Sequence, residues 1–238
     1  MYIISLNNMK KIPNKVIVWG IDDFNTLGLI RELGQPEIDL LFLIRGKKNI
    51  AAYSVYCKQY IETDSIEEGY EYLLSVYKKE KCKPIIITNG DDIATFIDSH
   101  LNELEPYFIL SGTRKKGLLK QYIDKNNMTR LAMKLGILCP QSRYISKSSM
   151  EGIEDITYPC LIKPSHEKEG HYNEFKFRVC KNKTSLQHTL KLVRPDSEFI
   201  VQQFIPKEGD LLIYGARMHD GKTLLAGALL KDRVADSG

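Results

Sequence analysis

The sequence has no Cys-x-x-Cys pair and no closely spaced set of cysteines. Its five cysteines stand far apart, at positions 57, 82, 139, 160 and 180. This spacing argues against a zinc knuckle and gives no disulfide framework. We therefore expect reduced thiols in a cytoplasmic protein. We also expect Cys160 and Cys180 to lie in the core, because free cysteines are among the most often buried residues.

Long apolar runs and a strong charge of one sign are also missing. The first residues, "MYIISLNNMKK", hold too short an apolar stretch for a signal peptide, and no window approaches a membrane span. The net charge of +4 is mild and dispersed, which fits binding of a small anion and argues against a nucleic-acid surface. We expect neither a membrane nor a nucleic acid among the partners, and the sequence leaves a homodimer open.

Two common site motifs are absent. "GIDDFNTLG", from Gly20 to Gly28, stands where a Rossmann strand would pass into its helix, but it lacks the GxGxxG spacing of a dinucleotide site. His166 and His171 flank glutamates, yet their five-residue separation fits neither a HExxH motif nor one face of a helix. We expect a solvated loop there and no divalent metal at these histidines.

The first 112 residues alternate strand and helix patterns. Strands are expected within 15–23, 39–46 and 83–92, and helices over 24–34, 65–81 and 93–106. This order predicts a Rossmann-like α/β domain whose parallel sheet is covered on both faces. Pairs of aspartates follow two of these strands, where open α/β sheets place ligands: Asp22, Asp23, Asp91 and Asp92. They could meet an amino-bearing substrate, and helix capping explains Asp91 and Asp92 equally well.

After residue 112 the pattern becomes α+β. A basic helical stretch is followed by strands at "PCLIK", "FKFRVCKN" and "EFIVQQFI", with the helix "TSLQHTLKLV" between the second and third. A hairpin is expected around Asp220 and Gly221, because Asp-Gly between apolar runs is a strong turn signal. We divide this part into a small lobe over 113–198 and the start of a large lobe over 199–238.

Lys163 is a charge at the end of an apolar strand. Alternation places Leu161 and Lys163 on one face of that strand, and Cys160 and Ile162 on the other. In the next strand Lys176 and Arg178 share a face, so that the basic residues of both strands could cluster on one face of a sheet. Such a cluster needs solvent or an anion; an ordinary solvated face is the alternative.

The order of these motifs resembles the ATP-grasp superfamily of carboxylate–amine ligases, in its D-aspartate-ligase-like or short carbamoyl-phosphate-synthase-like branch. A lysine opens a helix of the form K-x-x-M…A…G-I-x-x-P, a strand ends in "IKP" at Lys163, and "VQQFIPKEGD" matches the hinge strand. The helix motif consists of Lys125, Met128, Ala132, Gly136, Ile137 and Pro140. The motifs cover about residues 113 to 238, and the first 112 agree in architecture only.

The resemblance implies ATP and Mg²⁺ as cofactors, a small-molecule carboxylate and an amine as substrates, and an acylphosphate intermediate. It implies phosphate contacts for Lys125, Lys163 and Lys176, and a ribose contact for Asp210. The adenine pocket would be lined by Gln202, Gln203, Phe204 and Ile205, with the main chain of Gln203 and Ile205 reading the base. Candidates for the transferred γ-phosphate are Arg217, Lys231 and Arg233.

Three departures from the family pattern qualify this reading. The loop "SHEKEGHYNEFK" has one glycine where a glycine-rich phosphate loop is usual, and Gln202 and Gln203 stand where an acidic residue is common. No residue matches the family's metal ligands, which we expect beyond residue 238. We therefore expect a fragment of a longer ligase, with an incomplete second lobe and no turnover. The alternatives are a non-catalytic module that binds a nucleotide or anion, and an unrelated two-domain α/β protein.

Overall fold

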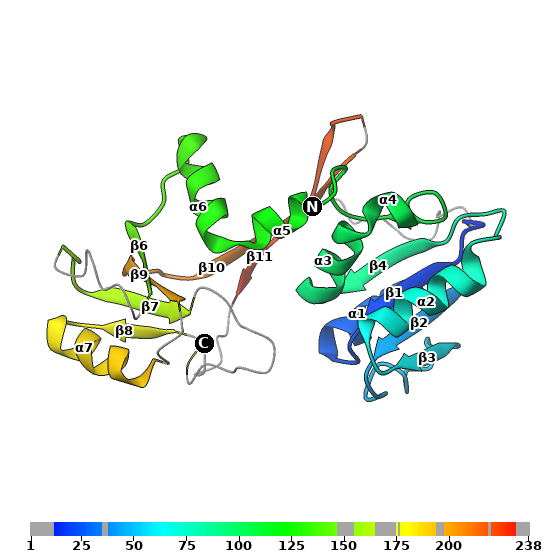
Figure 1. Ribbon diagram of the computed structural model, residues 1–238, viewed down its shortest axis with the longest axis horizontal. Helices are drawn as coiled ribbons and strands as arrows, with labels where there is room; N and C mark the ends of the chain where they lie inside the picture. Colours follow the sequence, from blue (N-terminus) through cyan, green and yellow to red (C-terminus); the bar gives the residue numbers. More distant parts are fainter. Residues whose placement is uncertain are drawn as a thin grey trace. The chain divides into compact units, whose positions relative to one another are not determined.

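The computed structural model describes residues 12–34, 38–146, 155–164, 175, 177–193, 198–218 and 220–231. The chain divides into two compact units, Met1–Ile123 and Asp124–Gly238 (Figure 1). The finer division at residues 112 and 198 stays a prediction. Every helix among the described residues is too short or too polar to cross a bilayer.

The first unit is built on a five-stranded, wholly parallel sheet with strand order β3-β2-β1-β4-β5. Its strands are β1 (Val16–Gly20), β2 (Leu40–Arg45), β3 (Tyr60–Thr63), β4 (Ile85–Asn89) and β5 (Ile109–Leu110). Its helices are α1 (Phe24–Gly34), α2 (Ile66–Tyr77), α3 (Asp91–Ser99), α4 (Leu101–Leu104) and α5 (Leu118–Ile123). The predicted alternation of strands and helices is confirmed. The two shortest strands, β3 and β5, were not predicted.

Both faces of this sheet are covered, as a parallel sheet requires. Along β1, Ile17 and Trp19 enter one core with α2 and α3, whereas Val16 and Val18 enter a second core with α1. All four side chains are essentially inaccessible to solvent. The period-two alternation of a strand therefore separates two cores, and both faces of β1 are apolar.

The second unit contains a four-stranded antiparallel sheet of order β6-β9-β7-β8 and one helix that packs on it. These strands are β6 (Ser142–Ser146), β7 (Cys160–Pro164), β8 (Arg178–Cys180) and β9 (Glu198–Gln203). The helices of the unit are α6 (Lys125–Lys134) and α7 (Lys183–Leu192). Leu186 and Leu190 of α7 pack against Cys160, Ile162 and Cys180. Both cysteines are buried free thiols, as expected.

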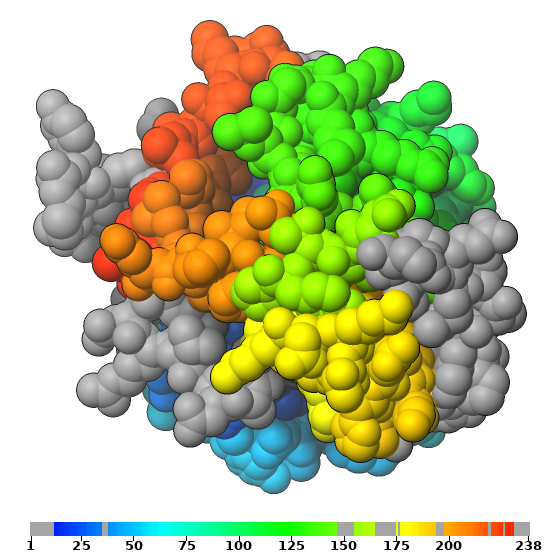
Figure 2. Space-filling view, turned by 90° about the vertical axis from the view of Figure 1, so that its left-hand side faces the viewer, coloured from blue at the N-terminus to red at the C-terminus, as the bar shows by residue number. Residues whose placement is uncertain are grey.

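A separate hairpin follows, formed by β10 (Asp210–Arg217) and β11 (Thr223–Lys231). Its turn has Gly221 at φ 86°, a conformation that favours glycine, and the Gly221 amide donates to the Met218 carbonyl oxygen at 3.0 Å. The predicted Asp-Gly hairpin is therefore confirmed. Its atoms, orange to red in Figure 2, lie open at the surface of the unit.

Candidate functional site

One face of the four-stranded sheet carries polar side chains from three strands. Cys160 and Ile162 of β7 are fully buried on the face that α7 covers, and Leu161 and Lys163 point to the other face and are partly exposed. The predicted alternation along β7 is therefore confirmed. We call this other face the lysine face; Ser142 of β6 and Gln202 of β9 also contribute to it.

Lys163 lies in an electrostatic environment that disfavours its charge. Burial, and secondly the positive charge of Lys125, lower the pKa of Lys163 below its usual value. Among the described residues, no carboxylate forms an ion pair with either lysine. Two ammonium groups from different elements thus repel each other, with no carboxylate partner for either in the described part of the chain, and an anion bound near both would relieve the repulsion.

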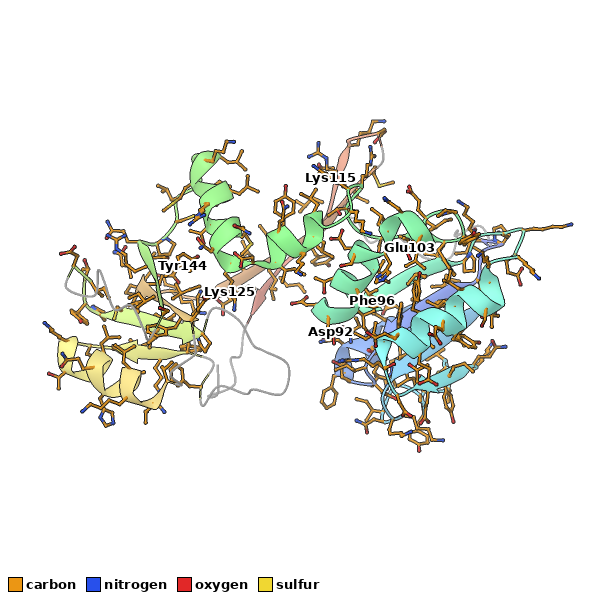
Figure 3. All side chains as sticks on the ribbon, viewed as in Figure 1. Asp92, Phe96, Glu103, Lys115, Lys125 and Tyr144 are labelled. Carbon is orange, nitrogen blue, oxygen red and sulfur yellow. The ribbon has the colours of Figure 1, made fainter. Side chains whose placement is uncertain are left out.

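Lys125 reaches this face because α6 begins beside β6. Asp124 is the N-cap of α6, and its carboxylate accepts from the Asn127 amide at 2.8 Å. The hydroxyl of Tyr144 on β6 donates to the Lys125 carbonyl oxygen at 3.1 Å. Figure 3 labels Lys125 and Tyr144 where α6 meets β6. The first turn of the helix is therefore tied to the sheet, which fixes where Lys125 leaves the backbone.

A chain of hydrogen bonds continues across the lysine face from Lys163. The Lys163 ammonium lies 3.4 Å from Oε1 of Gln202, a long contact, and Nε2 of Gln202 donates to Oγ of Ser142 at 2.9 Å. The Ser142 hydroxyl donates in turn to the Pro140 carbonyl oxygen at 3.0 Å. Ser142 was not among the predicted site residues, since a serine near the start of an edge strand carries no distinctive sequence signal.

The segment after β9 offers one unused backbone donor. The Gln203 amide donates to the Gln141 carbonyl at 2.8 Å, and the Phe204 amide donates to the Pro159 carbonyl at 3.1 Å. The Ile205 amide has no such partner in the described part of the chain, and the residue is 54% exposed. Of these three amides, only that of Ile205 is therefore open to a ligand.

Asp210 opens β10 and is half-buried. The Lys207 ammonium contacts both of its carboxylate oxygens, at 2.5 and 2.6 Å. The Asp210 carboxylate is therefore already engaged, and a bound hydroxyl group would have to share it with Lys207.

Two of the three candidates for the γ-phosphate, Arg217 and Lys231, lie at opposite ends of the hairpin. In the hairpin register Lys231 is opposite Asp210, whereas Arg217 is opposite Thr223 near the turn. Seven residues at about 3.3 Å each put Arg217 and the Lys231 backbone roughly 23 Å apart, so they cannot contact one phosphate group. The side chain of Lys231 and the whole of Arg233 lie outside the described residues.

The predicted basic cluster of two strands is wrong for Arg178. The antiparallel register places Arg178 opposite Ile162, and Val179 opposite Leu161. Arg178 therefore lies on the side of the sheet that faces α7, away from Lys163, where its guanidinium sits over the Phe175 ring at 5.1 Å. Lys176 lies outside the described residues.

Most of the aspartates at the strand ends of the first unit form hydrogen bonds or ion pairs within that unit. The Asp22 side chain is almost wholly buried and accepts from the amides of Asn49, Ala51 and Ala52 at 2.6 to 3.1 Å. Asp23 accepts from the Thr26 amide and from Asn89, both at 2.9 Å. These bonds are structural, so the substrate hypothesis loses its support at Asp22 and Asp23.

The remaining two aspartates stand where β4 passes into α3. Asp92 pairs with Arg45 at 2.7 Å, and the carboxylate of Asp91 has no partner among the described residues. Figure 3 labels Asp92 in the first unit. Of the four candidates, only Asp91 keeps an uncommitted carboxylate.

No group of three or more His, Cys, Asp or Glu side chains that could hold a metal ion occurs in the part of the chain that the structure describes. His166 and His171 lie outside that part. The described residues therefore supply no ready-made cluster of metal ligands, and the expectation that the metal ligands lie beyond residue 238 stays a prediction.

Comparison with known proteins gives two curated relatives. The chain is 25% identical over 234 residues to the C-terminal section of the large chain of carbamoyl phosphate synthase from Methanopyrus kandleri, covering 95% of this chain and 40% of that protein. It is 28% identical over 148 residues to the formate-dependent phosphoribosylglycinamide formyltransferase of Ignicoccus hospitalis, covering 60% of this chain and 35% of that protein. No model of a protein family matches the chain.

Solved structures share the fold. An N5-carboxyaminoimidazole ribonucleotide synthetase, crystallised as an ADP complex, superposes with a TM-score of 0.68 at 16% identity, covering 95% of this chain and 57% of the other. An L-amino acid ligase from Bacillus licheniformis superposes with a TM-score of 0.66 at 13% identity, covering 96% of this chain and 53% of the other.

These relatives and neighbours are ATP-grasp proteins, so the resemblance predicted from the sequence is confirmed at the level of the superfamily. The chain has the ATP-grasp fold in the extent that it covers. It spans less than half the length of the two curated relatives.

Proposed function

We propose that this chain carries the nucleotide-binding part of an ATP-dependent ligase that joins a carboxylate to an amine. The observation that carries the proposal is that Lys163, on the lysine face, feels the positive charge of Lys125, and that neither lysine has a paired carboxylate among the described residues. A polyphosphate supplies the missing negative charge, and charge-assisted bonds from ammonium groups to phosphate are strong. The ADP complex among the structures of the same fold supports the choice of an adenine nucleotide.

The roles of the other residues follow from their positions. The free amide of Ile205, with main-chain groups of Gln203, would read the edge of the base, and Phe204 would line its pocket. Asp210 would hold the ribose hydroxyls by exchanging part of its contact with Lys207. Lys176 would add a phosphate contact from the small lobe.

For the transferred γ-phosphate we favour Lys231 and Arg233 over Arg217. The hairpin register supports this choice, because Lys231 begins beside Asp210 and Arg217 is near the turn. The sequence alone did not distinguish among these three candidates for the γ-phosphate.

The proposed reaction has two steps. A carboxylate oxygen of the substrate attacks the γ-phosphorus of ATP, the bond from that phosphorus to the bridging oxygen breaks, and ADP and an acylphosphate form. The amine then attacks the acyl carbon and phosphate leaves. Catalysis of this kind rests on positioning and on stabilising the charge of the transferred group, which is what lysine and arginine side chains provide.

We propose further that the lobe begun by β10 and β11 is incomplete in this chain. The support is the exposure of apolar side chains on both faces of the hairpin, from 52% to 72%. Leu211, Ile213 and Leu230 lie on one face, and Leu212, Tyr214 and Leu229 on the other. An isolated two-stranded sheet is marginally stable in water, so these faces need further structure against them. This chain alone would then lack turnover.

A non-catalytic module is the second candidate. It is favoured by the lack of a metal-binding group in the described ranges, because binding of a nucleotide or anion needs only the lysine face. The two candidates differ in ADP formation: a ligase forms ADP from ATP when its carboxylate is present and turns over when the amine is present as well, and a binding module forms none.

The test has two arms, both on the full-length protein. In calorimetry, Lys125→Ala and Lys163→Ala should each weaken ATP binding about tenfold or more, corresponding to about 1.4 kcal/mol. Lys191→Ala is the matched control, because Lys191 is an exposed lysine in the last turn of α7, on the opposite face of the same sheet. Unchanged ATP affinity in both lysine variants would overturn the site. An ADP-release screen over amino acids and small amines then decides between ligase and module.

A further inference from the structure

We infer that Ser142 and Gln202 together set the base specificity of the proposed nucleotide site, by fixing which end of the Gln202 amide faces the ligand. The inference rests on the proposed function. It concerns a positioning residue, Ser142, that acts through Gln202 and does not itself touch the nucleotide.

The direction of the hydrogen-bond chain is fixed by its two ends. A carbonyl oxygen only accepts, so the Ser142 hydroxyl gives its single proton to Pro140. The oxygen of Ser142 is then an acceptor toward Gln202, and it can be met only by the amide nitrogen, at 2.9 Å. The amide oxygen must therefore point the other way.

At the other end stands an ammonium group, which only donates. Lys163 lies 3.4 Å from Oε1 of Gln202, so the same amide orientation satisfies both neighbours. A flipped amide would place two donors against each other at Lys163. At Ser142 it would place two acceptors against each other, because the hydroxyl proton is already given to Pro140. Unmatched polar contacts in a partly buried site are unfavourable, so the observed orientation of the amide is preferred.

Gln202 thus offers the ligand an acceptor. Its Oε1 has a second lone pair, and Gln202 directly precedes the segment with the free Ile205 amide. A ligand that spans Lys163 and Ile205 passes this oxygen. A purine with an amino group at position 6 can donate to it, whereas a purine with an oxygen at position 6 brings a second acceptor. We therefore expect adenine nucleotides to be preferred to guanine nucleotides through the side chain of Gln202, in addition to any contact with the main chain.

The neutral amide has a second consequence. A glutamate at 202 would pair with Lys163 and supply the carboxylate that both lysines lack. Gln202 accepts from Lys163 without neutralising it, and the lysine face keeps its full positive charge for the phosphates.

The test measures ATP and GTP binding by calorimetry on the full-length protein. Ser142→Ala removes the acceptor that holds Nε2, so the amide can rotate. We expect ATP affinity to fall about threefold to tenfold and the ATP-to-GTP preference to fall by at least about fivefold, which corresponds to about 1 kcal/mol. Ser142→Thr keeps the hydroxyl and suits an edge strand, and it should restore both values. Thermal stability is measured in parallel, because Ser142→Ala also loses the bond to Pro140, and the ATP-to-GTP ratio is compared at a temperature where both variants are folded.

The outcomes separate this inference from the proposed function. If the wild type binds neither nucleotide, both fail. If the wild type binds ATP, Lys163→Ala weakens it and Ser142→Ala leaves the ATP-to-GTP ratio unchanged, the inference alone fails. If Gln202→Glu binds ATP as well as the wild type does, the role of the neutral amide is wrong. A lowered ratio in Ser142→Ala that Ser142→Thr does not restore would show a packing effect and would also overturn the inference.

Discussion

The Tyr144 hydroxyl donates to the Lys125 carbonyl oxygen at 3.1 Å, and this bond joins the first turn of α6 to strand β6. The lysine that opens the helix is thereby held over the same sheet face as Lys163, whose pKa it helps to lower. The bond involves the backbone of Lys125, so the ammonium group stays free for a ligand.

Tyr144→Phe should therefore weaken ATP binding without removing a charge. Loss of one hydrogen bond costs about 1 kcal/mol, and we expect the dissociation constant for ATP to rise up to about fivefold. The measurement is calorimetry on the full-length protein. Tyr56→Phe is the control, because Tyr56 lies in the first unit and its hydroxyl has no hydrogen-bond partner among the described residues. Equal affinities in the two variants would show that the tie between α6 and β6 does not position Lys125.

ATP binding should depend on pH in the alkaline range through Lys163. Burial and Lys125 lower the pKa of Lys163, so in the free protein it loses its proton below the usual 10.5. The phosphates favour the charged form, so binding raises this pKa and takes up a proton. Affinity should then fall as pH rises through the lowered pKa of the free protein. For unfolding the sign is opposite: the cost of holding the charged lysine disappears at high pH.

The measurement compares binding enthalpies at several pH values below 10.5, in buffers of different ionisation enthalpy. The wild type should show proton uptake on binding ATP, and Lys163→Ala should show much less. Equal uptake in both proteins would assign the titration to another group and would remove the electrostatic argument for Lys163.

The sequence predicted the elements of the fold better than their pairing. Alternation along "PCLIK" correctly separated Lys163 from the core, because one strand contains that information within itself. Arg178 was misplaced, because the face that it shares with β7 depends on the register between two strands, and a shift of one residue reverses the face. Strand β5, of two residues, is too short to show any period.

The candidate site shows the same limit. Lys125 and Lys163 were predicted because the spacing of the family motifs marks them. Ser142 was missed, because its importance comes from two neighbours that only the fold brings to it. The role of Asp22 was also hidden, since the amides that it accepts from lie 27 to 30 residues away along the chain.

Asp22→Asn tests whether that carboxylate serves the fold or a substrate. Three backbone amides donate to its two oxygens, so an amide group in its place would set a donor against a donor. We expect a loss of about 1–3 kcal/mol in the free energy of unfolding, measured with denaturant. Asp91→Asn, at an exposed carboxylate, should change stability by less than about 0.5 kcal/mol. A stable Asp22→Asn variant with impaired ligation would restore the substrate role.

Two helical glycines give a matched pair for the packing of the first unit. A Cβ added at Gly69 of α2 would lie 2.8 Å from Cζ2 of Trp19, a ring that is fully buried in the sheet. Gly28 of α1 has no atom within 4 Å of the same position. Both changes to alanine gain helix propensity, by up to about 1 kcal/mol.

Only Gly69→Ala forces the ring to move. Overpacking of a core costs about 1–3 kcal/mol, so Gly69→Ala should lower the free energy of unfolding on balance, and Gly28→Ala should leave it unchanged or raise it. The indole Nε1 of Trp19 is buried and has no hydrogen-bond partner in the described ranges, so no hydrogen bond there holds the ring in its present position. Denaturant unfolding followed by the fluorescence of this single tryptophan measures both variants. If Gly69→Ala is as stable as Gly28→Ala, α2 does not pack on the ring as closely as these distances indicate.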